Sequence, residues 1–149
     1  MVIGYWLLNA NKLLNDYRLK RNMESRQFSF ETLEVYQKCR VLVSNIYRLQ
    51  RYFPQEERYG LCDQLRRAST SITANIAEGS GRQSTKEKIH FIEIAYGSLM
   101  EVFCELQTAA DLEYITESKL DEIRPQITDI AKMLSGLRAS LMKKASTPQ

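Results

Sequence analysis

Residues 61–82 carry two parallel stripes of side chains, and this pattern constrains the fold of the chain more than any other feature. At about 100° per residue, one face of a helix collects apolar residues, namely Leu61, Leu65, Ala68, Ile72 and Ile76. The neighbouring face collects Gln64, Arg67, Ser71, Asn75 and Glu78, called here the polar stripe. Scattered lysines and glutamates are typical of a solvated helix face. A row of amide, hydroxyl and charged groups instead predicts a polar interface, whose residues bond to one another and to a facing helix.

Three other segments show the helical repeat, in which apolar residues recur at alternating steps of three and four. In residues 30–52 and the position after them, the repeat consists of Val35, Cys39, Leu42, Ile46, Leu49 and Phe53. In residues 84–110 it consists of Ile92, Tyr96, Leu99, Phe103, Leu106 and Ala110. In residues 116–143 it consists of Leu120, Ile123, Ile127, Ile130, Leu134, Leu137 and Leu141. With residues 55–78, these segments predict four helices.

Turn-forming residues are scarce, since only 6 of the 149 residues are glycine and 3 are proline. Four helices with short connections place each helix antiparallel to the next. The sequence therefore predicts an all-α protein, an antiparallel up-down-up-down four-helix bundle over residues 28–144. Residues 1–27 are predicted to be an N-terminal extension, either disordered or a short helix, and residues 145–149 a frayed tail. Either Met1 or Met23 is the translation start under this interpretation.

The turn between the second and third helices is predicted from its cap residues. Gly79 suits a left-handed residue just past a helix end, and Gly81 extends the turn. Ser84 and Glu87 form a capping-box pattern, in which the two residues satisfy free backbone N–H groups reciprocally. The third helix is therefore expected to begin beside Ser84.

The net charge of +3 belongs to the N-terminal end of the chain, because residues 1–30 hold five basic and two acidic groups. The remaining residues are neutral, with 16 groups of each sign, so bulk charge does not argue for nucleic-acid binding. The three cysteines lack metal-site spacing, which predicts buried free thiols in a reducing cytoplasm. The short apolar run near the N-terminus predicts neither a signal peptide nor a membrane anchor.

Catalytic and metal-site patterns are weak in this sequence. Glu87 and His90 have the Glu-x-x-His spacing of di-iron bundles, but His90 is the only histidine, so one subunit cannot complete such a site. Glu101 and Glu105 lie one helical turn apart and are expected to face basic groups such as Arg67. We therefore predict no enzymatic activity, no cofactor and no metal.

Charge is polarised within the bundle. Residues 58–88 hold six basic groups, which are Arg58, Arg66, Arg67, Arg82, Lys86 and Lys88. Residues 93–129 hold nine acidic groups and two basic ones. The basic residues are candidates for phosphate contacts with a nucleic acid, and the alternative is that they are simply solvated helix faces.

These segments resemble a known family, the small four-helix-bundle proteins encoded in intervening sequences of bacterial 23S ribosomal RNA genes. The resemblance runs from about residue 30 to residue 141, and it depends most on Gln64-Leu65-Arg66-Arg67-Ala68 and on Asn75-Ile76-Ala77-Glu78-Gly79. It implies a ring-like homopentamer without established enzymatic activity. It also suggests kinship with the accessory protein of diversity-generating retroelements, which works by binding nucleic acid and a reverse transcriptase.

Three hypotheses follow for function. The first is a non-enzymatic homo-oligomeric scaffold associated with RNA or DNA, without a membrane partner. The second is a protein–protein adaptor without nucleic-acid contact, which docks a partner such as a reverse transcriptase through the acidic surface or through residues 1–27. The third is a metal-binding bundle, in which several subunits pool Glu87 and His90.

Overall fold

The computed structural model describes residues 28–146 of the chain, so the predicted N-terminal extension and residues 147–149 of the predicted tail lie outside the described residues. Four long helices make up the described part, and they are α2 (Glu34–Leu49), α3 (Leu61–Gly81), α4 (Thr85–Asp111) and α5 (Glu117–Ala145). Three short 3-10 turns complete it, namely η1 (Ser29–Thr32), η2 (Gln50–Tyr52) and η3 (Gln55–Tyr59).

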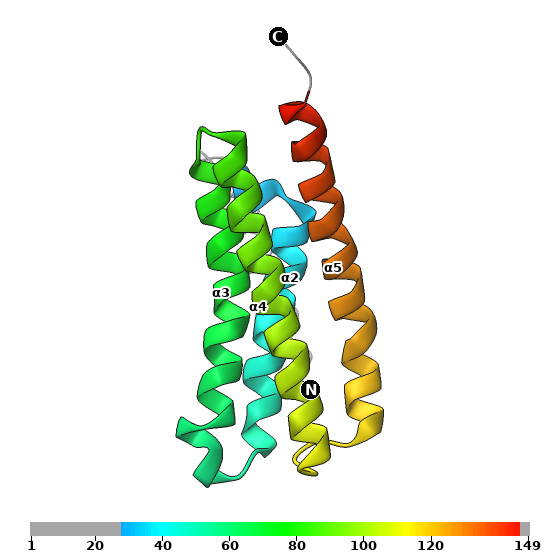
Figure 1. Ribbon diagram of the computed structural model, residues 1–149. Helices are drawn as coiled ribbons and strands as arrows, with labels where there is room; N and C mark the ends of the chain where they lie inside the picture. The colour runs from blue at the N-terminus through cyan, green and yellow to red at the C-terminus, as the bar shows by residue number, and fades with distance from the viewer. Residues whose placement is uncertain (1–27, 147–149) are drawn as a thin grey trace, which may run out of the picture.

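The helices form an antiparallel bundle in which each one reverses the direction of the one before it (Figure 1). Each helix packs against its neighbour in the chain, and α2 also packs against α5, which closes the bundle. The contact between α3 and α4 is the most extensive. This arrangement confirms the all-α, up-down-up-down architecture expected from the four apolar repeats.

The core consists of the apolar repeats of all four helices, with one correction in α4, where Tyr96 is exposed and Ala95 and Val102 are buried. Its large side chains with almost no exposed surface are Leu42, Ile46, Leu65, Ile72, Ile76, Leu99, Leu106, Ile130 and Leu134. Burying one leucine or isoleucine side chain contributes about 1.5–3 kcal/mol, so this core is the main source of stability. The charged groups that surround it belong mostly to exposed helix faces.

The glycine predictions for the second helix need correction. Residues 55–78 are not one helix, because the backbone at Gly60 (φ −102°, ψ −116°) separates η3 from α3. No described glycine has a positive φ, so Gly79 is not a left-handed cap. Instead Gly79 is buried inside α3, where a Cβ atom would lie 2.9 Å from the Cβ of Phe91. Helix α3 continues to Gly81, and Arg82 follows in an extended conformation.

The next two helices begin at hydroxyl caps. The Ser84 hydroxyl accepts a bond from the Glu87 backbone N–H at 3.5 Å, and the Thr116 hydroxyl accepts one from the Lys119 N–H at 3.1 Å. The Glu87 carboxylate does not complete a capping box in the described structure, since it lies 4.0 Å from Arg82 Nη1 instead.

The cysteines are free thiols, but only two are buried as expected. Cys39 and Cys62 are buried, whereas Cys104 is exposed. Burial raises the pKa of the Cys39 thiol to about 12, so this side chain is not a thiolate near neutral pH.

These environments predict how fast each thiol reacts. In the folded protein at pH 8, a thiol-specific reagent should label Cys104 in the fast phase and leave Cys39 unmodified. In denaturant all three should react. Mass spectrometry of the labelled protein checks this, and rapid labelling of Cys39 in the folded state would contradict the packing described above.

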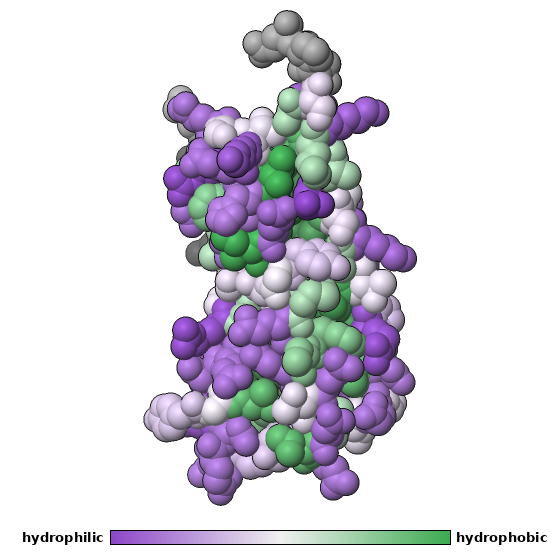
Figure 2. Space-filling view, viewed as in Figure 1, coloured by the Kyte–Doolittle hydropathy of each residue, from purple (hydrophilic) through white to green (hydrophobic). Residues whose placement is uncertain are grey.

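The outer surface over α4 and α5 is amphipathic. Figure 2 shows a broken band of apolar residues over these helices, flanked by hydrophilic ones. Exposed members of α4 include Ile94 and Tyr96, at 37% and 38% exposure. Within residues 28–146, no helix combines the length and apolar character needed to cross a membrane.

Candidate functional site

The polar stripe divides into an inner and an outer part. The inner part bonds to α4, because the hydroxyl oxygens of Ser71 and Ser98 lie 2.8 Å apart. Asn75 Nδ2 donates to the Ser71 carbonyl at 2.8 Å and to its hydroxyl at 3.0 Å. Ser98 is buried, and its hydroxyl bonds to the carbonyl of Ile94 at 3.0 Å. These bonds satisfy half-buried polar groups and set the register between α3 and α4.

The outer part of the stripe faces solvent. Arg67 and Gln64 are exposed, and together with Ala68, Ser71 and Glu101 they line a cavity of about 390 Å³. Arg67 makes no ion pair within the described part of the chain, and neither does Glu101. We expected Glu101 and Glu105 to face Arg67. Glu101 does line the same cavity as Arg67, but neither carboxylate forms an ion pair with it in the described part of the chain.

Glu105 is a charged residue inside the bundle. Its residue surface is only 7% exposed, and its Oε2 atom is buried without a hydrogen-bond partner among the described residues. Since Ser71 lies opposite Ser98 in antiparallel helices, Gln64 and Glu105 come to the same level of the bundle. Burial and the neighbouring charge of Glu101 raise the pKa of Glu105 to about 7. Ionising this carboxyl without a partner costs free energy.

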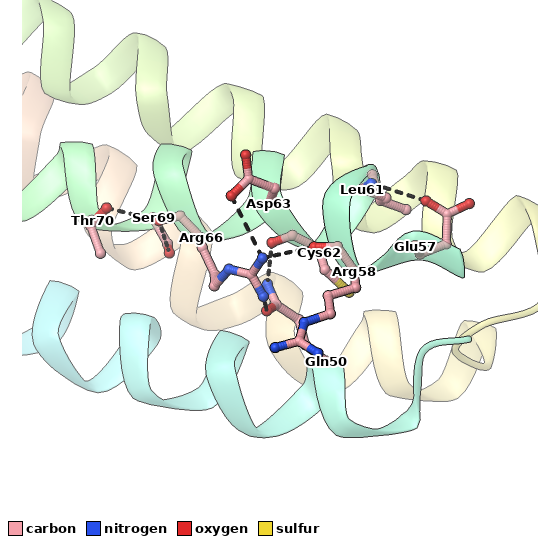
Figure 3. Close-up of polar contacts among 9 residues, drawn as sticks. All are labelled: Gln50, Glu57, Arg58, Leu61, Cys62, Asp63, Arg66, Ser69 and Thr70. Atoms are coloured by element: carbon pink, nitrogen blue, oxygen red, sulfur yellow. Dashed lines mark hydrogen bonds and ion pairs between the residues drawn. The ribbon is translucent and has the colours of Figure 1, made fainter. Parts of the chain in front are cut away.

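Arg66 joins three elements at the start of α3 (Figure 3). Its Nη2 donates to the carbonyl of Arg58 at 2.8 Å and lies 3.6 Å from Asp63, while Nη1 donates to Gln50 at 3.4 Å. Gln50 in turn donates to the carbonyl of Cys62 at 3.0 Å. The Arg66 guanidinium therefore holds η2, η3 and α3 together.

The opposite end of α3 carries the other basic candidates. Arg82 pairs with Glu78, and its guanidinium lies 4.8 Å from the centre of the Phe91 ring. Lys86 and Lys88, in the first turn of α4, have no ion-pair partner in the described structure. Their charges remain available to a ligand, whereas that of Arg82 is already neutralised.

The six basic candidates therefore do not form one patch in a single subunit. Arg58, Arg66 and Arg67 lie near the start of α3, and the other three lie beyond its end. A helix of 21 residues is about 30 Å long, which separates the two groups. The Arg58 guanidinium lies 5.7 Å from the centre of the Tyr59 ring.

Another basic surface was missed by the sequence reasoning. Residues 35–55 contain no aspartate or glutamate, and they contain four basic residues and three tyrosines. Arg40, Arg48 and Arg51 are exposed, and no carboxylate of the described residues pairs with them. The phosphate candidates were chosen from the basic residues of 58–88, so the basic residues of 35–55 were not considered. The sequence signal for this surface was the absence of acidic residues over 21 consecutive positions.

A groove lies at the end of this stretch, between α2 and the start of α5. It has a volume of about 450 Å³. Its lining residues are Asn45, Arg48, Leu49, Arg51, Tyr52, Lys119, Glu122, Ile123 and Gln126. Lys119 and Glu122 pair with each other at 2.5 Å, which leaves the two arginines as the unpaired charges of the groove.

Comparison with known proteins identifies the family. The family described as 23S rRNA-intervening sequence protein matches residues 31–136, which is most of the chain. The chain belongs to this family. It is also similar to the crystal structure of a protein of unknown function from the S23 ribosomal protein family of Bacteroides thetaiotaomicron. The identity is 28%, the TM-score is 0.65, and the match covers 70% of this chain and 95% of the other. No protein of curated function matches the chain.

The region matched as 23S rRNA-intervening sequence protein contains the polar stripe, Glu105 and the acid-free stretch, and it excludes residues 1–30. Within residues 28–146 of this family member, no group of three histidine, cysteine, aspartate or glutamate residues is placed to hold a metal ion. His90, which has the Glu-x-x-His spacing with Glu87, is exposed on α4.

Proposed function

We propose that this protein is a non-enzymatic scaffold that assembles from several copies and associates with RNA. The observation that carries the proposal is the unmet charge on the α3–α4 side: Arg67 and Glu101 are exposed and unpaired beside one cavity, and Glu105 is buried with an unpartnered oxygen. Membership in a family named for 23S rRNA intervening sequences supports the association with RNA.

Self-association is supported by the free energy that a single subunit loses when Glu105 is buried without a partner for its charge. A buried carboxylate without a partner is destabilising, while a cation brought by another copy would neutralise it. Arg67 is the exposed cation of the same surface, so a second copy that presents its own Arg67 would satisfy Glu101 or Glu105. Such an interface joins the same patch of two copies, which is the contact of a two-fold symmetric assembly. The homopentamer implied by the resemblance would need head-to-tail contacts between different patches in addition.

RNA association is supported by cations that the fold leaves unpaired. Among the predicted phosphate contacts outside the proposed interface these are Lys86, Lys88 and Arg58, whose guanidinium lies beside the Tyr59 ring. Repetition of such groups around an oligomer would bring together charges that are far apart in one subunit. Binding of this kind weakens steeply with salt, because phosphate contacts release counterions.

Light scattering coupled to size exclusion tests both parts, on protein purified without nuclease and monitored at 260 and 280 nm. We expect a particle of several subunits with excess absorbance at 260 nm. A nucleic-acid-free oligomer would favour the protein adaptor and its acidic α4–α5 surface. A monomer would contradict the scaffold.

Arg67→Ala should shift this particle toward free subunits, because it removes the cation proposed to cross the interface. We expect a rise of roughly tenfold or more in the dissociation constant, as is common when one partner of a buried charge pair is truncated. Lys132→Ala is the matched control, since Lys132 is also exposed and unpaired but lies on α5. Equal dissociation of the two variants would show that Arg67 does not cross the interface.

A further inference from the structure

We propose that single-stranded RNA binds along the exposed side of α2 and η2, with phosphates on arginines and bases on tyrosine rings. The surface consists of Arg40, Tyr47, Arg48, Arg51 and Tyr52, and is called here the α2 face. None of these residues was a phosphate candidate in the sequence analysis. The inference rests on the proposed association with RNA and specifies where, and in which form, the RNA binds.

The residues of the α2 face share one side of the bundle. At 100° per residue, Arg40, Tyr47 and Arg48 fall within an arc of about 100°, and η2 carries Arg51 and Tyr52 directly beyond the helix end. Of the four basic residues in the stretch 35–55, Lys38 is the one that forms an ion pair within the described residues, and its partner on α5 is Asp129. The α2 face itself therefore has only positive charge.

Its arginines are available for phosphate. Arg40, Arg48 and Arg51 are exposed, and no carboxylate of residues 28–146 lies within ion-pair distance of them. A guanidinium presents a planar fork of donors that matches phosphate oxygens. Arg48 and Arg51 also line the groove of about 450 Å³, whose volume lies within the range of ligand-binding clefts. The groove can therefore hold a nucleotide beside its phosphate contacts.

The tyrosines favour RNA over an acidic peptide. Tyr52 is 80% exposed and Tyr47 is 46% exposed, so both rings are offered to solvent beside the arginines. An acidic peptide would use the positive charge but has no planar group for the rings. Unpaired bases stack on such rings, which contributes roughly 1–3 kcal/mol per base and tolerates any sequence. Bases in a duplex are already stacked on each other, so these rings select a single strand.

Fluorescence anisotropy with a labelled 20-nucleotide single-stranded RNA of mixed sequence tests the inference, beside a hairpin duplex and a glutamate-rich peptide. Arg48→Gln/Arg51→Gln should weaken single-strand binding by about tenfold or more. It should also reduce the slope of log K against log salt by about 1.4, the value for two lost phosphate contacts. Lys132→Gln/Lys144→Gln removes two exposed charges from α5 and should leave binding within about twofold.

Tyr52→Leu separates stacking from charge. It should weaken single-strand binding by about tenfold, the effect of losing one stacked base, and should leave the salt slope and any duplex binding unchanged. These side chains are exposed, so the variants should fold, as circular dichroism will check.

The outcomes separate this inference from the proposed function. If the wild type binds RNA and the α2 variants bind equally well, the α2 face is not the binding site, while the proposed RNA association stands. If the wild type binds no RNA, both fail. Preferential binding of the glutamate-rich peptide would replace RNA with an acidic protein partner. Photocrosslinking of the unmodified protein to 4-thiouridine RNA gives a check without variants, and crosslinks should fall within residues 40–52.

Discussion

Replacing Glu105 with glutamine should raise the free energy of unfolding of the single subunit at pH 8 by about 3 kcal/mol. The reason is that burial and Glu101 raise the pKa of Glu105 from about 4.5 to about 7 in the folded chain. Between these values the unfolded chain loses its proton first, so wild-type stability falls as pH rises from 4.5 through 7. The shift corresponds to about 1.4 kcal/mol per pKa unit.

Urea unfolding at pH 4.5 and pH 8, at a dilution where light scattering shows single subunits, measures this effect. Glu105→Gln should match the wild type at pH 4.5 and exceed it at pH 8. Glu101→Gln is the control, because Glu101 is exposed and acts on Glu105 only as a neighbouring charge. It should change the profile only slightly. Parallel pH profiles for the wild type and Glu105→Gln would contradict the burial of an ionisable carboxyl.

The same substitution should have the opposite effect on assembly. If a second copy neutralises Glu105, glutamine removes the charge that the partner's cation requires, so the particle dissociates at lower dilution than the wild type. A variant that is more stable as a subunit and weaker as an oligomer would therefore identify Glu105 as part of the interface. Unchanged assembly would leave Glu105 as a destabilising group of the core alone.

Gly79→Ala should lower the free energy of unfolding by about 1–3 kcal/mol, although alanine is the better helix former. Gly79 is buried where α3 meets α4, and its added Cβ atom would lie 2.9 Å from the Cβ of Phe91. That atom is close to the backbone and cannot swing away, so the two helices must separate. Thermal and urea unfolding measure the loss.

Gly136→Ala provides the matched control. Gly136 also lies inside a long helix, α5, but apart from its chain neighbours and the nearby backbone of α5, no atom lies within 4 Å of the position of its Cβ. The substitution should therefore raise the free energy of unfolding by about 0.5–1 kcal/mol, the helix propensity difference. If Gly79→Ala were equally stabilising, close approach of α3 and α4 would not be the reason for glycine at position 79.

Local periodicity was sufficient for the bundle. The repeats that contain Leu65, Leu99 and Ile130 predicted which face of each helix is buried, because a helix places residues three and four apart on one side whatever its neighbours are. Ser84 was likewise predictable as a cap, because its bond partner is three residues away. These features depend on chain neighbours alone.

The candidate sites depended on contacts between segments distant in sequence. The sequence indicated that the polar stripe is special, but only the packed structure decided that Ser71 bonds to α4 while Arg67 faces solvent. Likewise Arg66 was a phosphate candidate until the fold placed Arg58, Gln50 and Asp63 around its guanidinium.

The sequence by itself therefore determined that there are four long helical segments, most of their buried positions and the antiparallel order, because these follow from periodicity and short connections. Only the tertiary structure decided which charged groups are paired within the subunit and which are left unpaired. It buried Glu105 without a partner, closed α3 onto α4 at Gly79, and left the acid-free α2 face open. The physical reason is that solvation and pairing of a charge depend on every segment packed around it, and no spacing along one helix contains that information.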